Sequence, residues 1–174
     1  MFFLTLFGMK PFARVVPYNI ENLLYFIMNS NNIEDIPHDV ESVTFINHYR
    51  AFDYLKGSEG NFSILELHRI LMEDQLSNPG TYRKVKVRVA DHVAPDPRNI
   101  PSLMRELETR FDEDPWFVHN QFLWIHPFVD GNGRTARLLL NNLHRLSYSD
   151  QMIIVDSNKR DLYYQMLEDF DRTK

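Results

Sequence analysis

The chain has no cysteine, no long hydrophobic run and no excess of basic residues, and each absence excludes a class of protein. Without cysteine it can form neither a disulfide scaffold nor a thiolate metal site. The apolar start, Met1–Met9, is far shorter than the roughly 20 residues of a bilayer-spanning helix. A net charge of −5 and a pI near 5.8 argue against nucleic acid as the main partner. We therefore expect no nucleic-acid partner and no membrane insertion. We expect a bacterial cytoplasmic protein, with export as an effector left open.

The length of 174 residues fits one domain with a core of ordinary size. A hydrophobic content of 44% with 25% charged residues is typical of a globular domain. Repeats and low-complexity tracts are lacking. We therefore expect a single domain over 1–174, with N-terminal helices in 1–60 and the core in 61–174. Met1–Met9 is expected to pack as a first strand or helix turn, unless the start of the chain is an extension.

Apolar residues recur at three- and four-residue spacing in seven segments, which predicts seven helices. Lys84–Val89 instead alternates valine with a basic residue, as a strand with one exposed face does. The sequence thus predicts an all-α fold with one short β excursion, and too few strands for a Rossmann fold. The predicted helices are Glu21–Asn32, Asp39 to about Lys56, a helix capped by Ser63, Ser102–Phe111, Pro115–Ile125, Arg134–Leu146 and Lys159–Asp171.

Residue type at the helix starts predicts the caps, and the apolar spacing predicts the buried faces. Asp39 is expected to cap the second helix, and Ser63 with Glu66 forms a capping box for the third. The side chains expected to face the core are Leu24, Ile27, Met28, Val43, Ile46, Ala51, Leu55, Ile64, Leu67, Ile70, Leu71, Leu138, Leu139, Asn142 and Leu143.

One segment, His126–Arg137, gathers an imidazole, a carboxylate, two glycines and two guanidinium groups. Glycines between two helices let the backbone amides approach a ligand closely. The N-terminus of the second helix adds unpaired N–H groups that attract anions. Arg134 and Arg137 lie three residues apart and can lean toward the same side of that helix. Two guanidinium groups, each able to donate two parallel hydrogen bonds, suit a polyphosphate. The segment predicts a phosphate site.

Two further side chains give this segment a chemistry. Asp130 is a candidate ligand for Mg²⁺, which binds one or two carboxylates together with substrate phosphates. His126 is a candidate base that could take a proton from an attacking hydroxyl. Taken singly, these residues are compatible with a plain turn, helix caps, a solvated face and a structural histidine. A zinc site formed with His119 is a further alternative, but it lacks a third ligand at useful spacing.

The run from His126 to Arg137 resembles the signature of the Fic family of protein adenylyltransferases, His-x-Phe-x-(Asp/Glu)-Gly-Asn-Gly-Arg-x-x-Arg. Every fixed position is matched, by His126, Phe128, Asp130, Gly131, Asn132, Gly133, Arg134 and Arg137. Upstream, Gly80–Arg83 and the alternating strand resemble the entry to the family's β-hairpin flap. Downstream, Tyr163–Tyr164 resembles its paired tyrosines near the adenine. The likeness covers roughly Ile64–Phe170 and implies a Fic-type helical bundle with a short β-hairpin flap.

The resemblance implies transfer of AMP from ATP to a protein hydroxyl on Tyr, Thr or Ser, with Mg²⁺ as cofactor. His126 would be the general base, Asp130 the metal ligand, and Phe128 a core anchor. Gly131, Asn132 and Gly133 would form the anion hole, while Arg134 and Arg137 would hold the β- and γ-phosphates. Flap residues Val87, Arg88 and Val89 would align an extended target segment, although an ordinary exposed hairpin fits the same pattern.

A second family pattern, (Ser/Thr)-x-x-x-Glu-(Gly/Asn), marks an inhibitory helix whose glutamate pairs with the second arginine of the signature. Ser30–Glu34 matches it, except that Asp35 follows. Thr109–Glu113 matches equally well and is also followed by Asp. The upstream position favours Glu34, which is otherwise a solvated residue at a helix end. The resemblance thus implies autoinhibition through a Glu34–Arg137 ion pair.

Three functions fit these residues. The first is the AMP transferase, with self-modification included among its targets. The second keeps the fold and removes AMP from a modified target. The third is a non-catalytic nucleotide-binding regulator, against which the intact His126 argues. The apolar N-terminal segment is compatible with a homodimer.

Overall fold

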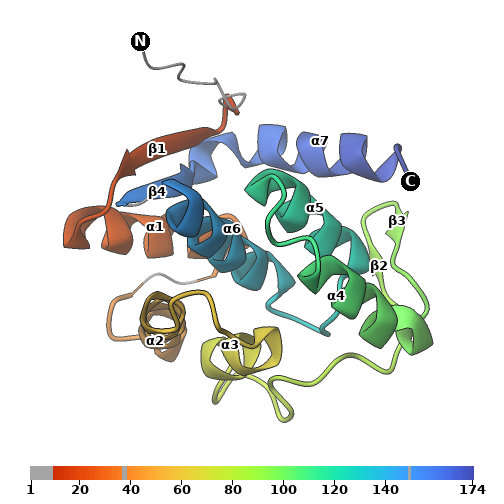
Figure 1. The fold of residues 1–174 in the computed structure, drawn as a ribbon. Helices are drawn as coiled ribbons and strands as arrows, with labels where there is room; N and C mark the ends of the chain where they lie inside the picture. Colours follow the sequence, from red (N-terminus) through yellow and green to blue (C-terminus); the bar gives the residue numbers. More distant parts are fainter. Residues whose placement is uncertain (1–9, 37–38, 149) are drawn as a thin grey trace.

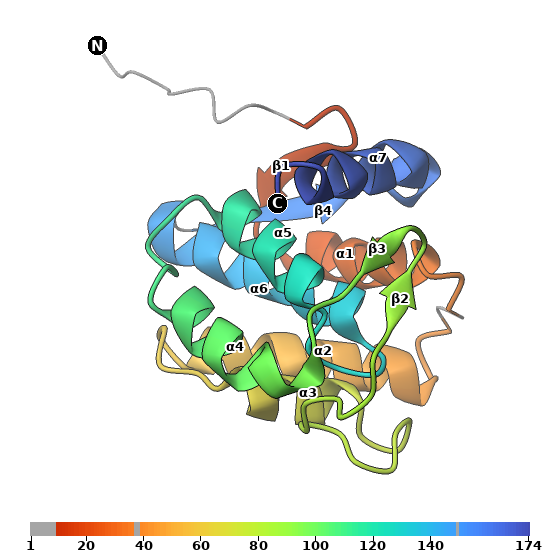
Figure 2. The same cartoon turned by 90° about the vertical axis from the view of Figure 1, so that its right-hand side faces the viewer.

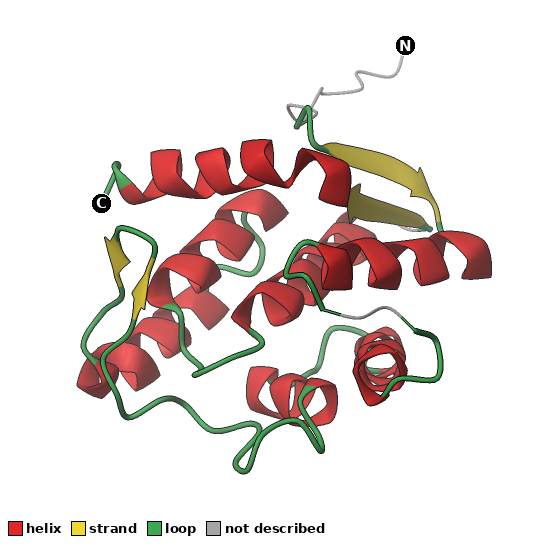
Figure 3. Cartoon of the chain, turned by 180° about the vertical axis from the view of Figure 1, so that it is seen from behind, coloured by secondary structure: helices red, strands yellow, loops and turns green. Residues whose placement is uncertain are grey.

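In a computed structural model of the protein, residues 10–36, 39–148 and 150–174 are described. These residues form seven α-helices and two small sheets (Figures 1 and 3). The all-α prediction with a short β-hairpin is confirmed, while the expectation for Met1–Met9 lies outside the described residues. The elements are β1 Ala13–Pro17, α1 Ile20–Asn32, α2 Val43–Gly57, α3 Ile64–Leu71, β2 Arg88–Val89, β3 His92–Val93, α4 Ile100–Glu108, α5 Pro115–Ile125, α6 Asn132–Tyr148, β4 Gln151–Val155 and α7 Arg160–Asp171.

Helix α6 runs through the centre of the bundle and packs against α5, and Figure 1 shows the other helices around this pair. Its predicted inward face is confirmed, because Leu138, Leu139, Asn142 and Leu143 are all buried. Helices α1, α2 and α3 cover one side of α6, and α4 and α5 cover the other. The core therefore holds both ends of the α5–α6 loop, which carries the predicted site. No described helix combines the length and apolar character needed to cross a bilayer.

The strand prediction was wrong in extent. Only Arg88–Val89 of the predicted strand Lys84–Val89 is a strand, and it pairs with His92–Val93 in a two-stranded hairpin. A second sheet was missed: β1 pairs antiparallel with β4, with Ala13 opposite Val155. Because β4 is short and its partner lies at the other end of the chain, local alternation could not reveal the pairing. This sheet fastens the entry to α1 onto the segment between α6 and α7.

The predicted faces of the first two helices needed correction. In α1 the buried side chains include Leu23 and Phe26, whereas Leu24 is exposed. In α2 Phe45 and Phe52 are buried with Ala51 and Leu55, while Val43 and Ile46 are exposed. Asp39 is not the cap of α2, since the Ser42 hydroxyl accepts from the backbone N–H of Phe45 at 3.3 Å. The aromatic residues decide both faces, because they bury the most apolar area.

Helix α3 follows its prediction closely. Ser63 is the N-cap, with its hydroxyl accepting from the backbone N–H of Glu66, and the four predicted apolar side chains are buried. The reciprocal half of the capping box is replaced, because the backbone N–H of Ser63 donates to the Tyr54 hydroxyl at 2.9 Å. Glu66 pairs with Arg69 instead. This helix brings His68 and Met72 against the α5–α6 loop.

Candidate functional site

The loop between α5 and α6 is held in a tight turn by its own residues. His126 ends α5 in the left-handed conformation, with φ of 49°, and Gly131 takes a φ of 75° just before α6 begins. The Asn132 side chain accepts from the backbone N–H of Phe128 at 3.0 Å and donates to the Phe128 carbonyl at 2.9 Å. Phe128 itself is buried in the core. The loop is therefore anchored at its centre.

His68 of α3 packs against this loop and bonds to it, and no pattern in the sequence indicated this role. Its ring stacks on Phe128 at a centroid distance of 3.6 Å. Nδ1 accepts from the backbone N–H of Gly80 at 2.8 Å, so the proton lies on Nε2, which donates to the Asp130 carbonyl at 2.9 Å. Burial lowers the pKa of His68 to about 4. A neutral ring is thus needed to join α3, the Gly80 turn and the loop.

Gly131 has no room for a side chain, and we predict that Gly131→Ala is strongly destabilising. A Cβ there would lie 2.6 Å from the Met72 sulfur, and alanine would have to hold a φ of 75°. Backbone strain and overpacking together should lower the free energy of unfolding by about 2–4 kcal/mol. Urea denaturation followed by circular dichroism measures the loss. Gly57→Ala is the matched control, because nothing lies within 4 Å of its Cβ, and a loss of the same size there would contradict the argument.

His126 lies in the wall of a cavity of about 690 Å³, a volume suited to a nucleotide-sized ligand. The α5–α6 loop, the hairpin tip and α7 all contribute to its wall. Burial lowers the pKa of His126 to about 4, and the charge of Arg83 acts in the same direction. The ring is therefore neutral near pH 7, as a proton acceptor must be. The other predicted site residues in this wall are Glu34, Val89, Asp130, Gly131, Asn132, Gly133, Arg137, Tyr163 and Tyr164.

Arg137 is the better placed of the two arginines for a ligand in the cavity. Its guanidinium is buried and donates to the Ser30 hydroxyl and the Ser30 carbonyl, both at 2.8 Å. Arg134 is also buried but does not line the cavity. It donates to the Gln75 amide oxygen at 3.1 Å and faces the Met72 sulfur at 3.2 Å. Arg137 therefore borders the cavity, whereas Arg134 contacts residues that follow α3.

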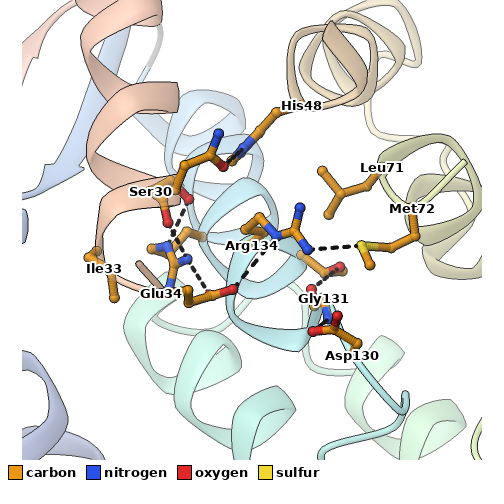
Figure 4. A network of polar contacts seen from close by, with 12 residues as sticks. Ser30, Ile33, Glu34, His48, Leu71, Met72, Asp130, Gly131 and Arg134 are labelled. Atoms are coloured by element: carbon orange, nitrogen blue, oxygen red, sulfur yellow. Dashed lines mark hydrogen bonds and ion pairs between the residues drawn. The ribbon is translucent and has the colours of Figure 1, made fainter. Parts of the chain in front are cut away.

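The Glu34 carboxylate pairs with both arginines. Figure 4 shows Glu34 beside Arg134. Its carboxylate accepts from Arg137 at 2.5 Å and lies 3.6 Å from Arg134 Nε. It also occupies the space next to Gly133 at the start of α6, where any Cβ would collide with it. The carboxylate therefore stands where the positive end of α6 would hold a phosphate group. The alternative match is different, since Glu113 pairs with Arg110 on the surface.

The end of α1 places Glu34 despite the departure at Asp35. Asp35 takes the left-handed conformation with φ of 54°, and the Ile36 N–H bonds back to the Asn31 carbonyl at 3.1 Å. Aspartate tolerates this conformation better than most residues. Its carboxylate also pairs with Arg160 of α7 at 2.6 Å. The turn that glycine or asparagine would make is thus made by an aspartate tied to a neighbouring helix.

The paired tyrosines contact this region in different ways. Tyr163 is buried, and its hydroxyl lies 3.4 Å from an Arg137 nitrogen and 3.0 Å from His119 Nε2. Tyr164 is partly exposed and donates to the Ile33 carbonyl at 2.9 Å. The other nitrogen of His119 faces the Asn120 amide oxygen at 2.8 Å. His119 is thus part of a buried network behind Arg137, and no group of three metal-ligating side chains occurs among the described residues.

The hairpin forms the remaining wall, and Figure 2 shows it to the right of α5 and in front of α1. Arg88 and Val89 are exposed and Val87 is half-buried. At its tip, His92 is held from both sides, with Nδ1 2.7 Å from an Asp171 oxygen and Nε2 2.8 Å from the Trp124 carbonyl. Val89 and His92 line the cavity, whereas Arg88 does not.

Asp130 offers the exposed carboxylate that a magnesium ion would need. One of its oxygens accepts from the Gly131 N–H at 2.6 Å, and the group borders the cavity. Mg²⁺ is commonly held by one or two carboxylates, waters and substrate phosphates rather than by a full protein cage. A single carboxylate beside an anion site therefore fits an ion that arrives with a nucleotide.

Comparison with known proteins places this site in a family. A sequence profile described as the Fic/DOC family matches residues 62–144. The chain is 35% identical over 117 residues to the protein adenylyltransferase Fic of Drosophila persimilis, and 36% identical to that of Drosophila virilis. Each alignment covers 60% of this chain, which spans only 23% and 24% of those relatives.

Solved structures agree with this result. A Fic family protein from Desulfovibrio desulfuricans aligns with a TM-score of 0.70 and 25% identity, covering 88% of this chain and 58% of that one. A Fic domain-containing signalling protein from Bacteroides thetaiotaomicron has the same fold, with a TM-score of 0.71 and 23% identity over 85% of this chain and 71% of that one. Residues 62–144, which include the whole run from His126 to Arg137, therefore match the Fic/DOC family, and the fold agrees with that match.

Proposed function

We propose that this domain transfers AMP from ATP to a hydroxyl group of a protein side chain. The observation that carries the proposal is the position of a neutral His126 in the wall of a nucleotide-sized cavity that Arg137 and the start of α6 also border. A base, an anion site and an exposed carboxylate converge there. The name of the fly relatives, protein adenylyltransferase, describes the same chemistry. Protein targets with a Tyr, Thr or Ser acceptor, this chain included, are part of the proposal.

In the reaction, the target hydroxyl attacks the α-phosphorus of ATP. The new bond joins that oxygen to phosphorus, the bond to the bridging β-phosphate oxygen breaks, and pyrophosphate leaves. His126 takes the hydroxyl proton. Gly131, Asn132 and Gly133 place backbone amides beside the phosphates, and Arg137 compensates their charge. Val87, Arg88 and Val89 would align the target by strand addition, and Tyr164 is the tyrosine exposed beside the cavity for the nucleotide base.

A magnesium ion would be held by Asp130 together with the phosphates, and it would compensate their negative charge. Arg134 would act in a different manner from Arg137. Because it is buried and does not line the cavity, its positive charge would act on the phosphates from a distance, near Glu34 and the start of α6. We assign direct contact with the terminal phosphates to Arg137.

We further propose that Glu34 restrains this activity. Its carboxylate takes up Arg137 and the space beside Gly133, which a terminal phosphate group would need. Ser30 helps by holding Arg137 through its hydroxyl and carbonyl. A bound nucleotide must therefore displace Glu34 or adopt a pose in which the phosphates are poorly aligned for transfer.

The test is transfer of label from ATP radiolabelled on the α-phosphate, in the presence of Mg²⁺, with His126→Ala beside the unmodified chain. Removing a general base typically costs a hundredfold to ten-thousandfold in rate. We expect label that survives denaturation and is lost by at least a hundredfold in His126→Ala. ATP labelled on the γ-phosphate should leave no label. Transfer by His126→Ala at the unmodified rate would refute the role of His126, and ATP binding without any covalent label would favour the regulator.

A further inference from the structure

The hairpin beside the cavity cannot hold its position through its own strands. Its ladder consists of two residue pairs, Arg88 with Val93 and Val89 with His92. Isolated two-stranded hairpins are marginally stable even when they are longer. Something outside the ladder must therefore fix the hairpin relative to the base.

Arg83 is buried, although it bears a positive charge and is not within 4.0 Å of any carboxylate of the described chain. Its partners are four carbonyl oxygens. Nε donates to the His126 carbonyl at 2.7 Å, and one terminal nitrogen donates to the Val85 carbonyl at 2.8 Å. The other donates to the Pro95 carbonyl at 2.7 Å and to the Ile125 carbonyl at 3.3 Å.

These four carbonyls belong to the two ends of the hairpin and to the end of α5, where the candidate base lies. Val85 precedes β2 and Pro95 follows β3, so they are the two roots of the hairpin. Ile125 is the last residue of α5 and His126 is its C-cap, and the carbonyls at a helix C-terminus have no partner further along the helix. A positive charge there also compensates the negative end of the helix. The backbone N–H of Arg83 adds a bond to the Pro127 carbonyl at 2.9 Å.

We propose that Arg83 is a positioning residue that fixes both roots of the hairpin to the end of α5, and so holds the target-aligning flap at a set place beside the His126 ring. Only a planar group with five N–H donors can reach all four oxygens at once. The proposal deepens the proposed function and rests on it for the role of the flap. Arg83 does not line the cavity, so it acts through the backbone of His126 and not on the nucleotide.

The positive charge of Arg83 also acts on the His126 ring. Burial lowers the pKa of His126 most, and the charge of Arg83 lowers it further, more than any other charge does. The other charged or titratable groups that act on the ring are His92 of β3, which lowers the pKa, and Glu34 after α1, which raises it. Arg83 therefore both fixes the backbone of the base and favours its neutral form.

Two substitutions of Arg83 distinguish the effect of the planar guanidinium shape from the effect of its positive charge. Arg83→Gln removes both, whereas Arg83→Lys keeps a positive charge but cannot span the four oxygens. Hydrogen exchange measured by mass spectrometry should be faster by about tenfold or more across residues 84–95 in both variants. NMR titration of His126 between pH 7.5 and 5.0 should show more protonation of the ring at pH 5.0 in Arg83→Gln than in the unmodified chain, and less of this change in Arg83→Lys. Arg98→Gln is the control, since Arg98 is exposed in the same loop and pairs with Asp96.

Unchanged exchange over 84–95 in Arg83→Lys, with the fold intact by circular dichroism, would overturn the proposal. If Arg83→Gln fails to fold, Arg83→Lys alone decides the question. In AMP transfer, kcat should fall while KM for ATP stays within about twofold, because the hairpin and the base are disturbed but Arg83 does not line the cavity. Exchange and titration need no transfer activity. These two measurements therefore test the positioning role of Arg83 even if the chain has no transferase activity.

Discussion

Replacing Glu34 with glycine is expected to raise ATP-dependent self-labelling by about tenfold to a hundredfold. That range corresponds to about 1.4–2.8 kcal/mol, the strength of a hydrogen bond to a charged group. The Glu34 carboxylate lies 2.5 Å from the buried Arg137 guanidinium and fills the space beside Gly133. Its removal frees both for the terminal phosphate. The measurement is the initial rate of labelling by ATP labelled on the α-phosphate, at ATP concentrations below saturation.

Two further variants show whether charge or bulk is responsible. Glu34→Gln keeps the size of the side chain but loses its charge, so an intermediate rate is expected. Glu41→Gly removes an exposed carboxylate outside the cavity and should leave the rate unchanged. Equal labelling by the unmodified chain and Glu34→Gly would remove Glu34 from an inhibitory role. The role of His126 would be unaffected by that result.

The same substitution should lower stability, and nucleotide should restore part of it. Without Glu34, two buried guanidinium groups lose the carboxylate that they share, at a cost of about 1–3 kcal/mol for a partly exposed partner. A ligand that binds only the folded state raises the melting temperature. ATP with Mg²⁺ should therefore raise the melting temperature of Glu34→Gly more than that of the unmodified chain.

The candidate site could be predicted from the sequence because most of its parts lie within twelve residues of each other. The run His126–Arg137 needs only one helix end, one turn and one helix start to bring its groups together. Helix positions were also predictable, since apolar spacing is a local property. The Glu34–Arg137 contact came from a resemblance, because a separation of 103 residues cannot be read from spacing.

What could not be predicted depends on contacts between distant segments. Arg83 contacts carbonyls 42 and 43 residues away, and His68 reaches the Asp130 carbonyl 62 residues away. Backbone carbonyls leave no trace in a residue pattern, so a buried arginine that binds them looks like any arginine. The β1–β4 pairing was missed for the same reason. The errors in the faces of α1 and α2 have another cause, since spacing alone fits more than one face and bulky aromatics decide between them.

A loss of stability below neutral pH is the other large effect that the structure predicts. Burial lowers the pKa of His68 and His126 to about 4 and that of His119 to about 3. It also lowers the pKa of His48 well below its usual range, with the charges of Arg134 and Arg137 acting in the same direction. All four rings are therefore neutral in the folded protein, whereas in the unfolded chain they titrate near pH 6.5.

The direction of the pH effect on stability follows from the number of protons bound by the folded and unfolded states. Between pH 6.5 and the lowered pKa values, the unfolded chain holds protons that the folded protein excludes, so acid favours unfolding. Above pH 6.5 the stabilisation is complete, and it is lost as the pH falls toward 4. Each ring contributes a slope of about 1.4 kcal/mol per pH unit, and the four together give a slope of about 5.5 kcal/mol per pH unit. Because folded domains are stable by only about 5–15 kcal/mol, unfolding is expected before pH 4 is reached.

Urea unfolding at pH 7.5, 6.5, 5.5 and 5.0, followed by circular dichroism, measures this slope. A variant with one ring fewer tests its origin. His119→Gln retains a group that can bond to the Tyr163 hydroxyl, which His119 contacts at 3.0 Å, but it cannot titrate. It should be less stable than the unmodified chain at pH 7.5 and should show a slope smaller by about 1.4 kcal/mol per pH unit. An unfolding free energy that stays constant between pH 7.5 and 5.0 would mean that these histidines are already charged in the folded protein. His126 could not then serve as a neutral base without losing a proton first.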